Sequence, residues 1–310
     1  TYNESEVVLS DGTIVSLRKP VFTLSNPGYG PFREDLMISP RIASPMIGLG
    51  MLEAIAEEDI LDWADPDDRD GDGISGRGNR IKSTLKQEMM LGRFGWKASK
   101  ATLKDQVTDA FSGDLGISSS LQPAHAGDCT SAQTACLAAP DGGDIKSGGV
   151  EINDHLLDLV TLYSRNLAVP ARRDVGKPDV LAGKKVFYET GCIACHRPKY
   201  VTPRDPLRPE QSFQLVWPYT DMLLHDMGEG LADNRPDGFA SGREWRTPPL
   251  WGIGLTNTVS GHTYFLHDGR ARSLLEAILW HGGEATAARN GVIALPTADR
   301  ENLLRFLNSL

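Results

Sequence analysis

The chain has 310 residues, of which 40% are hydrophobic and 24% are charged, as in a globular protein long enough for two domains. Its formal net charge of -9 argues against a nucleic-acid-binding protein, because that function depends on a basic surface. No run of about 18 apolar residues occurs, so no membrane span is predicted. The sequence begins at Thr1, without an initiating Met and in a polar, strand-like segment, so we expect a processed or trimmed chain without a signal peptide.

The first segment with a chemical pattern is an acidic loop. Asp68, Asp70 and Asp72 alternate along the chain and Gly73 follows them, which is the opening of an EF-hand-type calcium loop in which Ile74 would add a backbone carbonyl. The twelfth position holds Asn79 in place of a bidentate Glu, so weak affinity or a different geometry is expected. The alternative is a solvated acidic turn in which Asp and Gly serve turn geometry alone.

Two of the four cysteines, Cys129 and Cys136, flank a polar loop. We predict a disulfide that closes this loop at the surface, with two reduced cysteines of a cytosolic protein as the alternative. A structural disulfide is typical of an oxidising compartment. A periplasmic location is therefore expected.

Apolar residues at helical spacing predict helices over 151–167, 183–191, 273–280 and 297–310, and the first is followed by a linker at 170–173. Strand signals are few. We therefore predict a mainly α fold with long irregular loops.

The strongest motif is Cys192-Ile193-Ala194-Cys195-His196. C-x-x-C-H is the attachment signature of c-type haem: the two thiols form thioethers to the porphyrin, and the histidine is the proximal iron ligand. A chance match is expected in about one chain in a thousand of this composition. Two chemical alternatives are a zinc site, completed by Cys129 or Cys136, and a thioredoxin-like redox pair. The predicted helices before the motif and at the chain end favour haem.

A low-spin haem has a second axial ligand. The candidates downstream of the motif are Met222, His225, Met227, His262, His267 and His281. We favour His281, which ends a predicted helix and precedes Gly282-Gly283, where the backbone could pack against a flat ring; Met227 is the next candidate. Alternatively, His281 only ends its helix, where an imidazolium suits the helix dipole.

The sequence also repeats itself weakly. The stretch 44–50 is echoed 204 positions later by 248–254, and 94–103 recurs loosely as 265–274. The simplest interpretation is a two-domain, two-haem protein whose first haem-binding segment is missing from this chain. Coincidence between short Pro- and Gly-rich stretches is the alternative.

With these segments the chain resembles bacterial di-haem oxidoreductases, relatives of di-haem cytochrome c peroxidase that are often called thiol oxidoreductases. The resemblance covers essentially all 310 residues. Its most specific segments are 39–45, 70–77, 91–98, 223–228, 244–250 and 266–271. It implies two cytochrome c-like domains: a remnant of the N-terminal, peroxidatic domain over 1–165, and a C-terminal domain with haem c over 175–310.

The same resemblance implies site residues. Trp96 would lie between the two haems and Gln106 near the peroxidatic haem, while Asp114 is the nearest counterpart of the catalytic Glu, one methylene shorter and two positions closer to Gln106. His281 stands where the relatives have Met or Tyr. Alternatively, Gln106 and Asp114 lie on a helix surface and in the loop after it.

The mechanism that the resemblance implies is peroxide reduction at the N-terminal haem, with electrons supplied by the C-terminal haem. No C-x-x-C-H precedes Cys192, and no histidine precedes His125. We therefore expect one haem c, electron transfer as part of a peroxidase-like di-haem oxidoreductase, and no peroxide turnover by this chain alone. The alternative is a non-catalytic electron-transfer cytochrome. The expected partner is a small redox protein or a small-molecule electron donor or acceptor.

Overall fold

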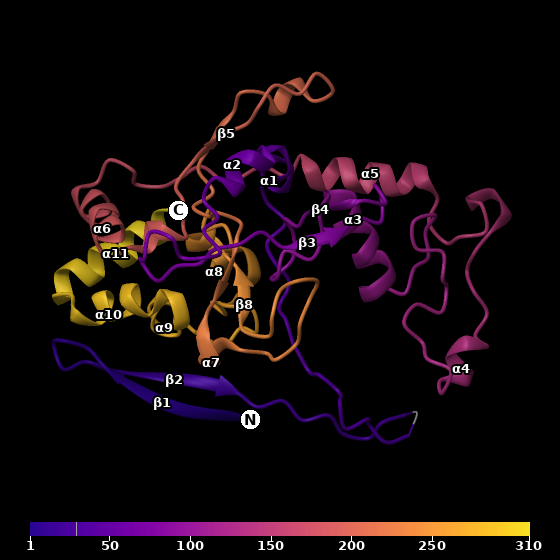
Figure 1. Ribbon diagram of the computed structural model, residues 1–310, viewed down its shortest axis with the longest axis horizontal. Helices are drawn as coiled ribbons and strands as arrows, with labels where there is room; N and C mark the ends of the chain where they lie inside the picture. The colour runs from indigo at the N-terminus through magenta and orange to yellow at the C-terminus, as the bar shows by residue number, and fades with distance from the viewer. Residues whose placement is uncertain (29) are drawn as a thin grey trace.

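The computed structural model describes residues 1–28 and 30–310. It consists of short helices and small two-stranded sheets joined by long irregular segments (Figure 1). The α-helices in these residues are α1 (Leu49–Ala54), α2 (Glu57–Leu61), α3 (Leu103–Asp109), α4 (Thr134–Leu137), α5 (Asp154–Arg165), α6 (Pro178–Glu189), α7 (Gly228–Leu231), α8 (Thr256–Ser260), α9 (Leu274–Leu279), α10 (Thr286–Ala294) and α11 (Thr297–Ser309).

The strands pair as four antiparallel hairpins. They are β1 (Tyr2–Val8) with β2 (Ile14–Pro20), β3 (Arg80–Lys82) with β4 (Met89–Leu91), β5 (Tyr200–Val201) with β6 (Leu215–Val216), and β7 (Leu224–Asp226) with β8 (Glu244–Arg246). Short 3-10 helices lie at Ile145–Ser147, Cys192–Ala194, Pro209–Gln211, Ile253–Leu255 and Gly283–Ala285, and a π-helix at Ala110–Asp114.

The prediction of a mainly α fold is wrong. Only 33% of the chain is helical and 14% is strand. Among its residues are 32 Gly and 19 Pro, which favour turns and end helices early. Most of the helices are therefore too short to dominate the fold. Three of the segments predicted as helical do contain α5, α9 and α11, and the fourth, 183–191, overlaps only the second half of α6.

The interior is divided between two main apolar clusters. One packs α1, α3 and α5 around Leu52, Leu103 and Leu157, and Met222 and Trp251 from the second half of the chain join it. The other is built on α6 and α11. A Cβ atom on Gly183 would lie 1.8 Å from the backbone oxygen of Asn302, so glycine permits the close crossing of these two helices. The domain boundaries stay a prediction.

The N-terminal hairpin packs against the C-terminal helices. Leu9 and Leu17 form a small cluster with Leu279 of α9, and the Arg272 guanidinium donates to the Ser16 backbone oxygen over 2.8 Å. In Figure 1 the hairpin lies along the side of the molecule that carries α9 and α10. No helix in residues 1–28 and 30–310 is both long enough and apolar enough to cross a membrane. The predicted disulfide between Cys129 and Cys136 is confirmed.

The first pair of echoed segments meets in space. Gly48 and Gly252, which are equivalent in the echo, both have positive φ angles, 66° and 75°. A Cβ on Gly48 would lie 2.4 Å from the Trp251 ring, and a Cβ on Gly252 would lie 2.6 Å from the side chain of Ile47. The side chain that lies beside each glycine therefore comes from the other copy: Trp251 lies beside Gly48, and Ile47 lies beside Gly252.

The two segments of the second pair, 94–103 and 265–274, have the same backbone conformation. A bridge joins Phe94 to Lys100 in the first copy and Phe265 to Ala271 in the second. Positive φ angles recur at equivalent positions, in Gly95 and Ala98 of the first copy and in Leu266 and Gly269 of the second. The helix that follows, α3 or α9, is capped by Thr102 or Ser273 at equivalent positions. This agreement argues against coincidence as the origin of the echo.

Candidate haem site

The Cys-x-x-Cys-His motif follows α6. Gly191, with φ 82°, turns the chain into the 3-10 helix Cys192–Ala194, and the backbone N–H of His196 donates to the Cys192 oxygen over 2.9 Å. The two cysteines are not joined in a disulfide, and burial raises the pKa of both thiols. The motif is therefore a tight turn that carries two neutral thiols and an imidazole.

The imidazole of His196 is fixed in one orientation. Its Nδ1 lies 2.9 Å from the backbone oxygen of Tyr219, and because a carbonyl only accepts, Nδ1 must carry the hydrogen. Nε2 then keeps its lone pair for a metal, which is the arrangement common to histidine ligands. Burial, and after it the nearby His281, lowers the pKa of His196 to about 4, which keeps the ring neutral at neutral pH.

His281 is held in the same way. It follows α9, and its Nδ1 lies 2.8 Å from the backbone oxygen of Ala277, so Nε2 again keeps its lone pair. Burial lowers the pKa of this ring as well. A Cβ on Gly283 would lie 2.0 Å from the Asp226 oxygen, so this glycine allows backbone-to-backbone packing. Packing of the adjacent backbone against a flat ring stays a prediction.

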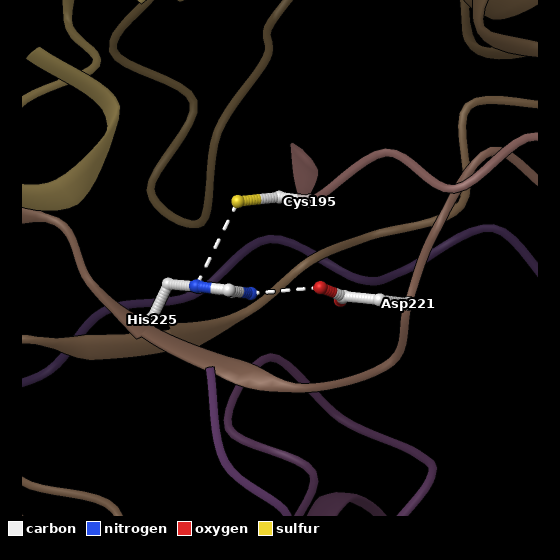
Figure 2. Close-up of side chains that lie close together, drawn as sticks. All are labelled: Cys195, Asp221 and His225. Atoms are coloured by element: carbon white, nitrogen blue, oxygen red, sulfur yellow. Dashed lines mark hydrogen bonds and ion pairs between the residues drawn. The ribbon is translucent and has the colours of Figure 1, made fainter. Parts of the chain in front are cut away.

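His225, another candidate ligand, has both ring nitrogens engaged. Nε2 lies 2.8 Å from Asp221 and Nδ1 lies 2.7 Å from Glu284, and Figure 2 shows the ring between Asp221 and the sulfur of Cys195, which is 3.7 Å from Nδ1. Burial by itself would lower the pKa of His225, but Asp221 and Glu284 outweigh it and raise that pKa well above its usual range. An imidazolium has no lone pair to give to iron.

The remaining candidate ligands have other surroundings. His262 is exposed and stacks on Tyr264, and His267 is buried against Trp245 with ring centroids 3.7 Å apart. Met222 belongs to the first apolar cluster. Met227 is half-buried, and the hydrogen bonds of the described residues do not involve its sulfur.

The two chemical alternatives to haem lose support. Cys129 and Cys136 are bonded to each other, so they are not available to complete a zinc site. A thioredoxin-like pair needs a βαβ unit with parallel strands. The sheets within residues 1–28 and 30–310 are four antiparallel pairs, and the motif follows a helix.

The surroundings of the motif fit a haem. Arg197 Nε, Tyr200 Oη and Trp280 Nε1 are buried without a hydrogen-bond partner in the described part of the chain, and such donors are costly unless something accepts from them. Arg197 follows His196 directly, Tyr200 lies four residues after His196, and Trp280 directly precedes His281. Carboxylates such as haem propionates would accept from these donors.

The predicted catalytic residues are not joined to one another. Trp96 is half-buried and donates through Nε1 to the Ile42 oxygen over 2.8 Å. Gln106 is half-buried in α3, and Asp114 is exposed at the end of the π-helix. Among the described residues, no hydrogen bond or ion pair links any two of the three predicted catalytic residues.

The acidic loop brings its three carboxylates together, with oxygens of Asp68, Asp70 and Asp72 within 4.8 Å of one another. Asp72 also accepts from the backbone N–H of Ile74 over 2.8 Å. Asn79 is fully buried and donates to the Lys97 oxygen over 2.8 Å. Asn79 therefore serves the fold, and the calcium site stays a prediction.

Sequence analysis missed the residues that position the histidines. Tyr219 and Ala277 act through backbone oxygens, which carry no sequence signal. Asp221 and Glu284, which lie 4 and 59 residues from His225 in the sequence, both hydrogen-bond to its ring. The available signal was a histidine directly after the apolar stretch 222–224, with an acid four residues before it.

Comparison with known proteins identifies the family of the chain. The sequence model of the family described as "Di-haem oxidoreductase, putative peroxidase" matches residues 1–310. No curated protein matches the chain. A solved structure of hydrazine synthase from Kuenenia stuttgartiensis, pressurised with 20 bar xenon, is 16% identical and covers 94% of this chain and 100% of its own, with a TM-score of 0.33; a score this low carries no argument. On the whole-length family match, the chain belongs to the di-haem oxidoreductase family.

Proposed function

We propose that the chain holds one haem c on Cys192 and Cys195, with His196 and His281 as the axial iron ligands, and that it transfers electrons as part of a peroxidase-like oxidoreductase. One observation carries the proposal. The imidazoles of His196 and His281 each donate Nδ1–H to a backbone oxygen, of Tyr219 or of Ala277, and so each keeps the Nε2 lone pair for a metal.

The bound haem would supply reversible one-electron chemistry. The chain's own residues would fix both rings. Arg197 would neutralise a propionate, and Tyr200 would donate a hydrogen bond to one. Two histidines favour a lower reduction potential than a histidine and a methionine would. The disulfide and the haem motif together support a periplasmic location.

Trp96, Gln106 and Asp114 remain the proposed catalytic residues of the first half, with peroxide as the proposed substrate. The alternative is an electron-transfer cytochrome without catalysis. The exposure of Asp114 favours this alternative for the chain by itself, since a group in open solvent lacks the environment that tunes a catalytic acid.

The test is expression with a periplasmic haem-maturation system. Intact mass should show one covalent haem, and the oxidised protein should have a low-spin absorption spectrum. A colourless product would contradict the proposal, and two haems would contradict the expected number. Peroxide-dependent oxidation of a reduced donor, followed by absorbance, separates the enzyme from the plain cytochrome.

A further inference from the structure

A cavity of about 390 Å³ lies where the two echoed segments meet. Gly48 and Trp251, one from each copy, are among its lining residues, and Trp217, Arg172 and Gln211 line it as well. Its volume is within the range of small-molecule pockets. The predicted functional residues do not line this cavity, so it is a separate place in the fold.

The cavity contains a guanidinium without an acidic partner. Arg172 stacks over the Phe306 ring at 5.4 Å and donates to the Ser309 hydroxyl over 3.2 Å. Its Nε is buried without a hydrogen-bond partner, and no ion pair within the described ranges includes it. By contrast, Arg165, which also lines the cavity, is paired with Glu53.

A second polar group in the cavity also lacks a partner. Gln211 is 2% exposed, and its Oε1 has no hydrogen bond among the described residues. A buried acceptor in this state is costly unless a donor reaches it. Glu210 supplies the side-chain carboxylate of the lining and is exposed to solvent, where water screens its charge.

The rest of the wall is aromatic and apolar. Trp217 and Trp251 contribute two indole rings, and Met51, Val169 and Val216 add aliphatic surface. Aromatic walls favour a flat apolar body, an unpaired guanidinium favours a carboxylate, and an unpaired amide oxygen favours a donor such as a hydroxyl.

We propose that this cavity binds a small aromatic acid that also carries a hydroxyl group, as in a phenolic carboxylate. Arg172 binds the carboxylate, Gln211 accepts from the hydroxyl, and the two tryptophans enclose the ring. The site stands next to the haem segment without being part of it, because Trp217 packs 6.4 Å from Tyr219, whose backbone oxygen holds His196.

The test is calorimetric titration of the purified haem protein with three probes. They are para-hydroxybenzoate, benzoate without the hydroxyl, and para-hydroxybenzamide without the charge. We expect para-hydroxybenzoate to bind most tightly. Arg172→Gln should weaken the two carboxylates at least tenfold and leave the amide unchanged, and Gln211→Leu should weaken the two hydroxyl probes several-fold and leave benzoate unchanged.

Arg173→Gln is the matched control, because the neighbouring arginine does not line the cavity. The inference is overturned if para-hydroxybenzoate shows no saturable binding in the millimolar range, or if the Arg172 and Gln211 variants bind all three probes as the wild type does. Two variants at different positions keep the test decisive should one of them not fold. Haem content is read separately from absorption, so failure of the haem proposal would be recognised independently.

Discussion

The two copies of the turn-and-helix unit, 94–110 and 265–281, have the same backbone conformation and differ in the residue that ends the unit. Both turns have positive φ angles at two equivalent positions, and both helices begin at a hydroxyl cap. After α9 the second copy presents His281, whereas the equivalent position of the first copy is Ala110, where a π-helix begins. The same frame therefore ends at an imidazole in one half and at an alanine in the other.

The turns themselves face a common residue. Lys97 of the first turn lies over the Trp245 ring at 4.3 Å, and His267 of the second turn stacks on the same ring at 3.7 Å. Lys97 is fully buried and paired with Asp233. The equivalent loops thus meet, but with different chemistry: an ion pair on one side and a neutral ring on the other.

The largest expected effect comes from making the second copy resemble the first. In His281→Ala the haem should stay covalently attached, since both cysteines remain, but the low-spin absorption spectrum should be lost because the iron loses its sixth ligand. Absorption spectra of the oxidised and reduced protein check this. The exposed His262 provides the matched control, His262→Ala, which should keep the spectrum. An unchanged low-spin spectrum in His281→Ala would remove the assignment and favour Met227.

A second large effect concerns the contact between the copies. Gly48→Ala forces a Cβ to 2.4 Å from the Trp251 ring at a positive φ angle, so strain and overpacking together should cost about 3 kcal/mol of unfolding free energy. Gly261→Ala is the control: its φ is also positive, at 70°, but nothing lies within 4 Å. It should cost only about 1 kcal/mol. Denaturant unfolding measures both, and equal costs would show that the contact adds nothing.

Some features of the two halves can be predicted from the sequence, and others cannot. The haem motif, the long amphipathic helices and the disulfide loop have local signatures, and α6, α11 and the Cys129–Cys136 bond follow from them. The echo was visible as a pattern that pairs Gly95 with Leu266, but only the structure shows that both residues have positive φ angles. Long-range partners could not be predicted. Glu284 lies 59 residues from His225 in the sequence, and only the fold brings the two together.

The buried ring of the second turn should make stability depend on pH. Burial lowers the pKa of His267 to about 4, below the value of about 6.5 in an unfolded chain. Between these values the unfolded state binds more protons, so stability should fall as pH decreases from about 6.5 to 4, by on the order of 3 kcal/mol. His267→Gln should flatten this part of the curve of melting temperature against pH. A curve of unchanged slope would show that other groups carry the dependence.

The equivalent caps should have equivalent energies. Thr102 accepts from the backbone N–H of Asp105 over 3.0 Å, and Ser273 accepts from that of Glu276 over 3.1 Å. Replacement by Ala should cost about 1 kcal/mol at each site, because each change leaves a helix N–H without an acceptor. Thr102→Ser and Ser273→Thr keep a hydroxyl and should cost less, as urea unfolding would show. A cap whose loss costs nothing would break the functional equivalence of the two helices.

The smallest expected effect tests what only the first half has. The acidic loop lies between the echoed segments 44–50 and 94–103, whereas in the second half only ten residues separate 254 from 265, so the loop has no counterpart there. Three clustered carboxylates repel one another, and a calcium ion would relieve this. Calcium at three times its Kd should stabilise the protein by about 0.8 kcal/mol and raise the melting temperature by about 1 °C. Asp70→Ala should abolish the rise, while Asp174→Ala, which removes an exposed acid outside the loop, should keep it. If calcium does not shift the melting temperature of the wild type, the loop is a turn whose aspartates accept backbone N–H groups, as Asp72 does from Ile74. The two halves then differ here only in the number of residues.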